Sequence, residues 1–363
     1  MLKRSSNGDF LAGHPNNLPK HELLAQWRYR ESEEKMKAIR LHAKGGPEQL
    51  VYEDAPQPHL RPGDALVRVH ACAITHTELT WTPTYTTQDG HDRTPTIPGH
   101  ELAGVVEAVT PDVTDVKPGD AIYGLADFYR DGAAADYIAI HAADLAPKPP
   151  SLNFVQAAAV PLAALTAWQA LFDHSALAPR QSVLIHGAAG GVGSFAVQLA
   201  HHRGINVIGT ARTENLDMLR HLGADEVIDY TSTRFEDRVH DVDAVFDTVG
   251  GETLQRSFTV LRRGGILVSV VDEPPADLAV KRGVRAMYFI VEPSRGELIE
   301  IGRLIEAGDL RPIIEAVFPL EQTREAFEHG AAGHSRGKIV LEIDKEPAAE
   351  RDTALRDAGR RVA

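Results

Sequence analysis

A short apolar run, a glycine-rich turn and an amphipathic helix follow one another without interruption at residues 183–200. Val183–Gly187 has the character of a buried strand, and Gly190, Gly191 and Gly193 follow it directly. Glycines at such a turn let the backbone approach a pyrophosphate closely, and the following helix supplies free N–H groups and the positive end of its dipole. This segment predicts a parallel α/β sheet that binds a dinucleotide at the turn.

The glycine pattern departs from the plain G-x-G-x-x-G, because Ala188 stands at the first glycine position, with Gly190 and Gly193 at the other two. Alone, such a pattern is weak, and an ordinary tight turn between a strand and a helix would also produce it. A second apolar run, Ile205–Gly209, follows the helix and completes the strand–helix–strand context that the motif requires. We therefore favour the dinucleotide site over the ordinary turn.

The residues after this second run indicate which dinucleotide is bound. In NAD sites an acidic residue about 20 positions past the glycines usually holds the adenosine ribose hydroxyls. Here the chain has Thr210, Ala211 and Arg212, so no carboxylate would repel a 2′-phosphate, and Arg212 can pair with one. The sequence predicts NADPH as the cofactor. A solvated loop cation is the alternative for Arg212.

Charge and composition exclude several other classes of protein. The formal net charge of -13 argues against nucleic acid and anionic membranes as partners. No apolar run approaches the roughly 18 residues of a transmembrane helix, and residues 1–35 lack the apolar core of a signal peptide. A single cysteine, Cys72, excludes an internal disulfide framework, so a reducing, cytoplasmic compartment is expected.

The pattern of expected strands and helices changes twice along the chain, which predicts two domains, one inserted into the other. Residues 36–155 are β-rich, with short alternating runs broken by Pro-Gly pairs. Residues 156–314 alternate strands with helices, as expected for a doubly wound parallel sheet, and residues 315–345 return to the β-rich texture. The strands expected in the middle part are Val183–Gly187, Ile205–Gly209, Glu226–Ile228, Ala244–Asp247 and Gly265–Val270. Residues 1–35 are expected to form a flexible arm, and residues 346–363 a charged tail.

Several motifs, spread from about Met36 to Ile343, carry a resemblance to a known family. They are Gly99–Val106, Val116–Gly124, Leu165–Ala167, Ala188–Gly193 and Gly337–Leu341. Together with the domain layout, they make the chain resemble the medium-chain dehydrogenase/reductase superfamily, and the form of the glycine turn resembles its quinone oxidoreductase branch. The resemblance implies a GroES-like β-rich catalytic domain interrupted by a Rossmann dinucleotide-binding domain. It also implies an NADPH-dependent enzyme without zinc, and a homodimer paired through a strand near Ile266–Val270 or a segment near Met287–Val291.

Zinc-dependent members of this superfamily hold their catalytic metal with two cysteines and a histidine. In this sequence Thr75 stands at the first cysteine position and Ala164 lies about where the second would be, so only His100 and Glu101 remain. A catalytic zinc needs three protein ligands and an open position. No metal site is therefore expected, and His100 is expected to be a buried histidine bonded near Glu101. A zinc-dependent alcohol dehydrogenase with the atypical ligands His76, His100 and Glu101 stays open as an alternative.

The predicted cofactor site combines the glycine turn with residues carried over from the family. The turn and Val192 are expected at the pyrophosphate. The family pattern implies that Thr166 lies near the nicotinamide and that Arg212 and Tyr230 surround the 2′-phosphate. The complete predicted set is Thr166, Gly190, Gly191, Val192, Gly193, Arg212, Tyr230, Val249, Ser269 and Lys338.

The substrate pocket is expected in the cleft between the domains, at the carboxyl ends of the parallel strands. Thr75, His76 and Tyr85 are its candidate catalytic residues, with His76 as a possible proton donor. Without zinc no Lewis acid polarises an alcohol oxygen, whereas a quinone or an α,β-unsaturated carbonyl accepts hydride readily. The sequence thus predicts hydride transfer from NADPH to a small-molecule quinone or enone. Two other functions stay open: an enoyl-thioester reductase of lipid or polyketide metabolism, and an NADPH-binding protein without catalysis.

Overall fold

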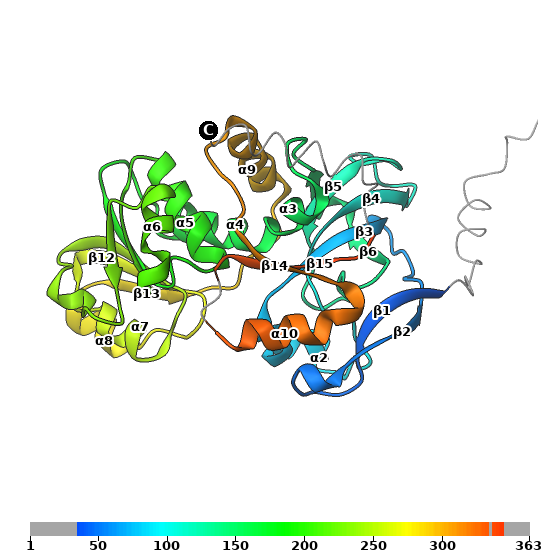
Figure 1. The fold of residues 1–363 in the computed structure, drawn as a ribbon, viewed down its shortest axis with the longest axis horizontal. Coiled ribbons are helices and arrows are strands. Elements are labelled where there is room, and N and C mark those ends of the chain that lie inside the picture. Colours follow the sequence, from blue (N-terminus) through cyan, green and yellow to red (C-terminus); the bar gives the residue numbers. More distant parts are fainter. Residues whose placement is uncertain (1–34, 334–335, 345–363) are drawn as a thin grey trace, which may run out of the picture.

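The computed structural model describes residues 35–333 and 336–344. The predicted arm therefore lies outside the described residues except for Lys35, and the predicted tail lies outside them entirely. Figure 1 shows two lobes side by side, one around β12 and β13 and the other around β3, β4 and β5. Among the described helices, none is long and apolar enough to cross a membrane.

One lobe is built on a six-stranded parallel sheet with the strand order β10-β9-β8-β11-β12-β13. Its strands are β8 (Ser182–Ile185), β9 (Asn206–Ala211), β10 (Glu226–Asp229), β11 (Val242–Asp247), β12 (Leu261–Ser269) and β13 (Arg285–Tyr288). Counted from the first strand of the sheet, this is the doubly wound order 3-2-1-4-5-6. The order reverses beside β8, and ligands of such sheets bind at the carboxyl ends of the strands that flank the reversal.

All five strands expected in this lobe are confirmed, with shifts of a few residues at their ends. The sixth, β13, escapes the strand pattern because it is short and has no fully buried residue. Because β12 is paired to β11 on one side and to β13 on the other, it has no free edge. The expectation that Ile266–Val270 could extend the sheet of a partner subunit is therefore wrong.

Helices connect the parallel strands and cover the sheet (Figure 1). They are α5 (Gly191–His202), α6 (Leu216–His221), α7 (Gly251–Ser257) and α8 (Ala276–Arg282), with α9 (Arg295–Ala307) leading back to the other lobe. In α5 every residue from Gly193 to Ala200 is buried, and small side chains such as Ala196 and Ala200 let the helix pack closely. The glycine turn is thus held by a strand before it and a buried helix after it.

The second lobe is β-rich, as the sequence predicts, and is completed by the end of the described chain. Its main sheet has the order β14-β15-β3-β4-β5-β7, with β6 on β3, and β1 and β2 form a separate pair. Its strands are β1 (Lys35–Leu41), β2 (Leu50–Pro56), β3 (Asp64–Ile74), β4 (Glu101–Val109), β5 (Ala121–Leu125), β6 (Tyr137–His141), β7 (Leu145–Pro147), β14 (Ile314–Pro319) and β15 (Lys338–Glu342). Because β15 pairs with β3, chain segments from both sides of the nucleotide-binding sheet share one sheet. Two helices, α2 (Thr82–Tyr85) and α10 (Thr323–Ala331), lie in this lobe.

A helical connection between β7 and β8 joins the two lobes. It consists of α3 (Phe154–Ala158), α4 (Pro161–Trp168) and the π-helical turn η4 (Gln169–His174). The first seven residues of α4 are all buried, and the largest apolar cluster of the described chain runs from β5 through α4 to β8 and α9. The Tyr123 hydroxyl donates a hydrogen bond to the Leu298 carbonyl across this contact. One side of the interlobe boundary is therefore packed solid.

Candidate functional site

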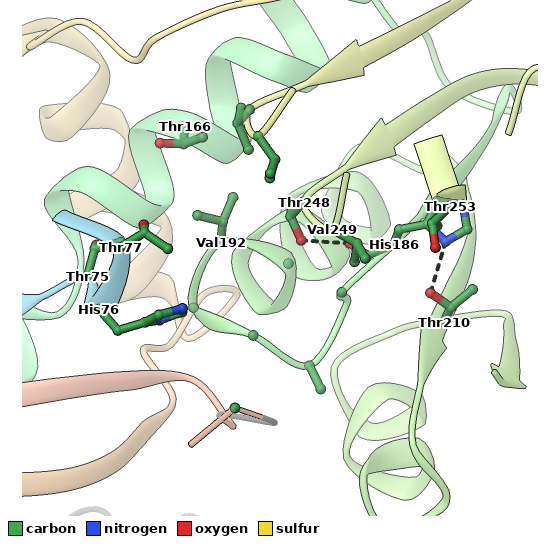
Figure 2. Close-up of a pocket in the computed structure, with 18 of the residues that line it drawn as sticks. Thr75, His76, Thr77, Thr166, His186, Val192, Thr210, Thr248, Val249 and Thr253 are labelled. Atoms are coloured by element: carbon green, nitrogen blue, oxygen red, sulfur yellow. Dashed lines mark hydrogen bonds between the residues drawn. The ribbon is translucent and has the colours of Figure 1, made fainter. Parts of the chain in front are cut away.

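The opposite side of the interlobe boundary encloses a cavity of about 1360 Å³. Figure 2 shows Thr75, His76, Thr77 and Thr166 at one end, His186, Thr210 and Thr253 at the other, and Val192 between them. The cavity therefore runs from the β-rich lobe, past the glycine turn, to the outer part of the parallel sheet, as expected for a reversal beside β8.

The glycine turn forms the middle of the cavity wall, and its geometry explains its unusual sequence. Gly187 takes a φ of +64°, which favours glycine. A Cβ on Gly193 would lie 2.2 Å from the Gly187 carbonyl oxygen, so no side chain fits there. Ala188 is fully buried, and a Cβ on Gly209 would lie 3.1 Å from its methyl group. The missing first glycine of the motif is thus accommodated by a glycine on the neighbouring strand.

Arg212 and Tyr230 meet at the far end of the cavity, where the sequence places a 2′-phosphate. The Arg212 Nε donates a 3.0 Å hydrogen bond to the Tyr230 hydroxyl, and both residues line the cavity. The nearby Asp229 carboxylate accepts hydrogen bonds from the Thr213 and Thr231 side chains, which hold its pKa below its usual range, and it does not line the cavity. A negatively charged group can therefore approach Arg212 without facing that carboxylate.

Sequence reasoning missed other residues at this end. The hydroxyl-rich run 231–234 follows β10 and lines the cavity, as do Asn215 and Arg256. The run could have been found, because a cluster of small hydroxyl residues ending in an arginine directly follows a strand of the sheet. Arg256 could not, since it comes from α7 and is fixed by an ion pair with Glu236, whose pKa the pair lowers to about 2.

The charge of the cavity wall contrasts with that of the whole chain. Among the described residues that line it, no Asp or Glu is present, whereas Arg212, Arg234, Arg256 and Lys338 contribute cations. The chain as a whole carries a formal net charge of -13. A wall of one sign concentrates ligands of the opposite sign. Glu236 partly neutralises Arg234 and Arg256, and Glu101 pairs with Lys338, so Arg212 is the cation on which the attraction of an anion mainly depends.

The His186 side chain stabilises the wall at the far end of the cavity. Its Nδ1 lies 3.1 Å from the Thr210 hydroxyl and its Nε2 lies 3.0 Å from the Ser257 hydroxyl. Burial lowers the pKa of His186 to about 3, so the ring is neutral at physiological pH. A neutral ring between two hydroxyls links β8, β9 and α7 without placing a charge in the core.

Lys338 and His76 flank the glycine turn from the β-rich lobe. The Lys338 ammonium pairs with the buried Glu101 carboxylate, and a Cβ on Gly191 would lie 2.6 Å from the Lys338 Cδ. His76 lines the cavity beside them, and burial, followed by the charge of Lys338, lowers its pKa. The Gly337 N–H also donates to the Ala189 carbonyl at 3.0 Å. The two lobes therefore meet at the turn itself.

The near end of the cavity is neutral and partly aromatic. Trp81 and Phe128 pack edge to face with ring centroids 5.6 Å apart, and both line the cavity. Thr75 lies here as predicted, and Thr166 also lines this end, its hydroxyl donating to the Leu162 carbonyl at 2.6 Å. The remaining lining residues at this end include Thr77, Thr80, Thr82, Pro83, Leu162, Phe289 and Val291.

Two predicted site residues lie outside the cavity wall. Tyr85 is buried in the core below β1, and its hydroxyl donates to the Leu79 carbonyl at 2.8 Å. Ser269 is fully buried at the end of β12, where its hydroxyl donates to Asp247 at 3.0 Å. Neither lines the cavity, so both expectations of direct contact are corrected. Val249, also predicted, does line it, at an exposed position on its rim.

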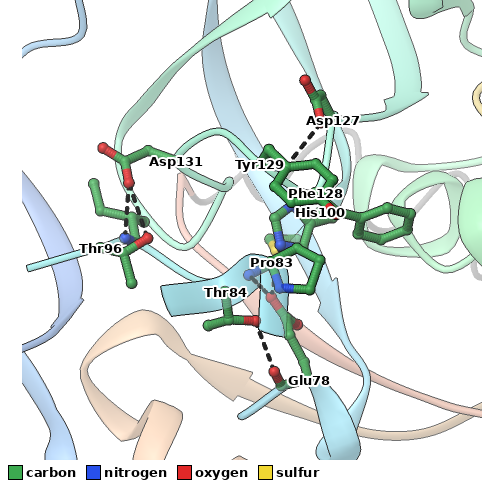
Figure 3. Close-up of polar contacts among 12 residues, drawn as sticks. Glu78, Pro83, Thr84, Thr96, His100, Asp127, Phe128, Tyr129 and Asp131 are labelled. Carbon is green, nitrogen blue, oxygen red and sulfur yellow. Dashed lines mark hydrogen bonds and ion pairs between the residues drawn. The ribbon is translucent and has the colours of Figure 1, made fainter. Parts of the chain in front are cut away.

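His100 and Glu101, which stand at the positions considered above for a catalytic zinc, each have another side chain as partner. His100 Nε2 lies 3.3 Å from a Glu78 carboxylate oxygen (Figure 3). Glu101 pairs instead with Lys338. The expectation that His100 is bonded near Glu101 is therefore wrong. The Glu101 side chain points toward Lys338 on β15, and His100 contacts Glu78 instead. Burial lowers the pKa of His100 to about 3 and raises that of Glu78 to about 7.

This donor set does not fit a catalytic zinc, which needs three ligands on one centre. Thr75 is a poor ligand, and the carboxylate of Glu101 is already engaged by Lys338. Within residues 35–333 and 336–344, no group of three or more His, Cys, Asp or Glu side chains could hold a metal ion.

Comparison with known proteins agrees with the fold. The family described as "Alcohol dehydrogenase GroES-like domain" matches residues 61–150, and the family described as "Zinc-binding dehydrogenase" matches residues 222–341. A protein of Arthroderma benhamiae named "Probable zinc-binding oxidoreductase, mitochondrial" is 36% identical over 79% of this chain and 91% of its own length. The "NADPH-dependent alkenal/one oxidoreductase, chloroplastic" of Arabidopsis thaliana is 35% identical over 68% of this chain and 64% of its own length.

A solved structure agrees as well. The quinone oxidoreductase from Coxiella burnetii superposes with a TM-score of 0.80 at 32% identity, covering 85% of this chain and all of its own. These similarities in sequence and structure agree with the doubly wound sheet that begins at the glycine turn and with the β-rich lobe that β15 completes. The chain belongs to the medium-chain dehydrogenase/reductase superfamily, in its quinone-oxidoreductase-like branch.

Proposed function

We propose that this protein is an NADPH-dependent oxidoreductase that transfers hydride to a quinone or an activated C=C bond without a metal ion. Its family makes it an NAD(P)-dependent oxidoreductase. The observation that carries the finer proposal is the cavity wall, which has cations at the far end, no carboxylate among its described residues, and a neutral aromatic near end. A relative named for NADPH-dependent alkenal/one reduction supports the same substrate class.

We propose one orientation for the cofactor in the cavity. We place its pyrophosphate on the turn Gly190–Gly193, where α5 begins and where the His76 ring lies within the cavity wall as a hydrogen-bonding group. The 2′-phosphate then reaches Arg212 and Tyr230. The nicotinamide reaches the near end, beside Thr166. In this proposal His76 serves the pyrophosphate, a different role from the proton donor expected from the sequence.

The near end then has to orient the acceptor and exclude water. NADPH, when bound, supplies the hydride. Trp81 and Phe128 offer a flat apolar surface to a neutral unsaturated carbonyl. The Thr75 and Thr77 side chains line the same end and place hydroxyl groups where negative charge would develop on the carbonyl oxygen. Positioning and hydroxyl donors suffice for an acceptor that is already electron-poor.

The proposal is tested by following NADPH oxidation with a set of acceptors on protein whose zinc content has been measured. A naphthoquinone and a 2-alkenal should be reduced by metal-free protein. Ethanol with NADP⁺ tests the alcohol dehydrogenase alternative with His76, His100 and Glu101 as ligands, and crotonyl-CoA tests an enoyl-thioester substrate. Activity confined to alcohols, or dependent on stoichiometric zinc, would overturn the proposal. NADPH binding without turnover of any acceptor would favour a non-catalytic role.

Oligomeric state and location complete the proposal. We propose a homodimer in which β13 of one protomer pairs with β13 of its partner, because Arg285–Tyr288 forms one edge of the six-stranded sheet. Light scattering should give twice the mass of the 39.5 kDa chain, and a monomer would contradict this. A cytoplasmic location is likewise a proposal, and subcellular fractionation tests it against the organelles in the names of the two relatives.

A further inference from the structure

The segment that follows β13 forms part of the near end of the cavity. Phe289 and Val291 line the cavity and are each only 8% exposed. On the side of the sheet, the segment is tied down at its start, where the Phe289 N–H donates to the Ser269 carbonyl at 3.2 Å. Because β13 ends at Tyr288, the position of the chain beyond Phe289 depends on contacts outside the sheet, including those with the helical connection between the lobes.

A single buried side chain makes that contact with the backbone. The Gln169 Oε1 accepts a hydrogen bond from the Glu292 N–H at 3.1 Å, and its Nε2 donates to the Glu292 carbonyl at 2.9 Å. The same Nε2 donates to the Glu297 carboxylate at 3.0 Å. Gln169 therefore occupies both backbone groups of Glu292, as a neighbouring strand would. Its side-chain amide has no remaining freedom to rotate without losing these bonds.

Gln169 can reach Glu292 because it begins the π-helical turn η4. Thr166, which lines the cavity, lies three residues earlier in the preceding helix α4. At the other end of η4, the His174 ring packs against the Phe289 ring with centroids 4.4 Å apart. The π turn thus holds the segment at two points, Glu292 and Phe289. Such turns inside α-helices occur frequently at functional sites.

We propose that Gln169 is a positioning residue for hydride transfer, which it serves by fixing the segment Phe289–Val291 against the nicotinamide end of the cavity. The inference rests on the function proposed above. Gln169 itself does not line the cavity, so it acts through the segment it holds. Because a displacement of about 1 Å at the reacting atoms can cost 10²-fold in rate, loosening this segment should lower kcat and leave the adenosine end of the site unchanged.

A matched control exists in the same lobe. Gln198 on α5 is equally buried and makes the same double hydrogen bond, accepting from the Arg311 N–H at 3.0 Å and donating to the Arg311 carbonyl at 3.1 Å. It does not line the cavity. The variants Q169L and Q198L therefore remove the same chemistry from two places, one next to the nicotinamide end and one away from it.

The experiment measures kcat with a naphthoquinone, the affinity for NADPH and the affinity for 2′,5′-ADP, which lacks the nicotinamide. For Q169L we expect kcat to fall by about 10- to 100-fold, with the 2′,5′-ADP affinity within about twofold of wild type. Q198L should keep wild-type kcat at a comparable thermal stability. Should Q169L fail to fold, H174A loosens the same segment at Phe289 and should show the same selective loss of kcat.

The outcomes separate the two claims. Equal losses of kcat in Q169L and Q198L, or a wild-type kcat in Q169L, would overturn the positioning role while leaving the proposed function intact. A combined loss of kcat and 2′,5′-ADP affinity in Q169L would also overturn it, because general destabilisation would then explain both. A wild-type protein that binds neither NADPH nor 2′,5′-ADP would overturn the proposed function itself, and the positioning role with it.

Discussion

The two ends of the cavity are built on different physical principles. At the far end, arginines and hydroxyl groups surround an open space, and the neutral ring of His186 braces the wall from below. At the near end, apolar rings and threonines line the cavity, and the segment after β13 is clamped through its backbone. The far end can gain affinity from charge, which acts over several ångströms and tolerates small displacements. The near end has to gain rate from geometry, which does not.

The largest effect is expected from a change in the glycine turn, because the turn lies between the two ends of the cavity. Gly193→Ala places a Cβ 2.2 Å from the Gly187 carbonyl oxygen and has to displace the turn. Affinity for NADPH and for NADH should fall together, by about 100-fold or more. Gly296→Ala is the control, since a Cβ there meets no atom within 4 Å. Isothermal titration with both nucleotides measures the effect, and unchanged affinities would show that the turn does not carry the pyrophosphate.

A smaller and more selective effect is expected at the far end. Arg212→Ala removes a charged donor, and hydrogen bonds to charged groups contribute about 1.5–3 kcal/mol. NADPH affinity should therefore fall by about 10- to 100-fold, while NADH affinity stays near its wild-type value. Arg220→Ala, at an exposed position on α6, provides the control. An equal loss for both nucleotides would show that Arg212 does not distinguish the 2′-phosphate.

At the near end, Trp81→Ala should change the acceptor and not the nucleotide. The edge-to-face contact with Phe128 is lost, and such pairs contribute about 0.5–1.5 kcal/mol. The KM for a naphthoquinone should rise by about 3- to 10-fold, with the KM for NADPH unchanged as an internal control. A change confined to NADPH would place the acceptor elsewhere in the cavity.

The last effect leaves the ligands aside and concerns how pH changes the stability of the far end. Burial lowers the pKa of His186 from 6.5 to about 3, so the unfolded chain binds this proton at a higher pH than the folded protein does. The stability that this group contributes is therefore complete above pH 6.5 and is lost as the pH falls toward 3. Relative to His186→Gln, wild-type protein should lose up to about 1.4 kcal/mol of unfolding free energy per pH unit below 6.5.

Urea unfolding of both proteins between pH 7.5 and 4.5 measures this difference. Because the other titrating groups are common to both proteins, the difference between the two curves isolates His186. A constant difference across this range would mean that folding does not change the pKa of His186.

Local patterns were sufficient to predict the elements that dominate the fold. The five strands, the β-rich lobe and the glycine turn depend on hydrophobic periodicity and on glycine, which act within a few residues. Arg212 could be anticipated because it follows the second strand past the glycine turn, whereas Tyr230 was implied by the family resemblance. The short edge strand β13 lacked a buried run and left no such pattern.

The errors concern side chains whose surroundings depend on distant segments. Tyr85 sits in a polar stretch that suggests a pocket, yet the packing of β1 and β2 over it makes it a core residue. Glu101 could pair with either a neighbouring histidine or a lysine from β15, and only the alignment of β15 with β3 decides for Lys338. No sequence pattern signals the role of Gln169, because the hydrogen bonds of its side chain reach a residue more than 120 positions away.

The contact between Gly337 and the glycine turn has a consequence for synthesis on the ribosome. The nucleotide-binding sheet is complete once Tyr288 has emerged, but the N–H that bonds to Ala189 and the Lys338 side chain beside Gly191 belong to residues made some fifty positions later. A nascent chain can therefore finish its parallel sheet well before its pyrophosphate cradle. If the turn binds the pyrophosphate as proposed, the complete site becomes available to a cofactor only after both of these later residues have been synthesised.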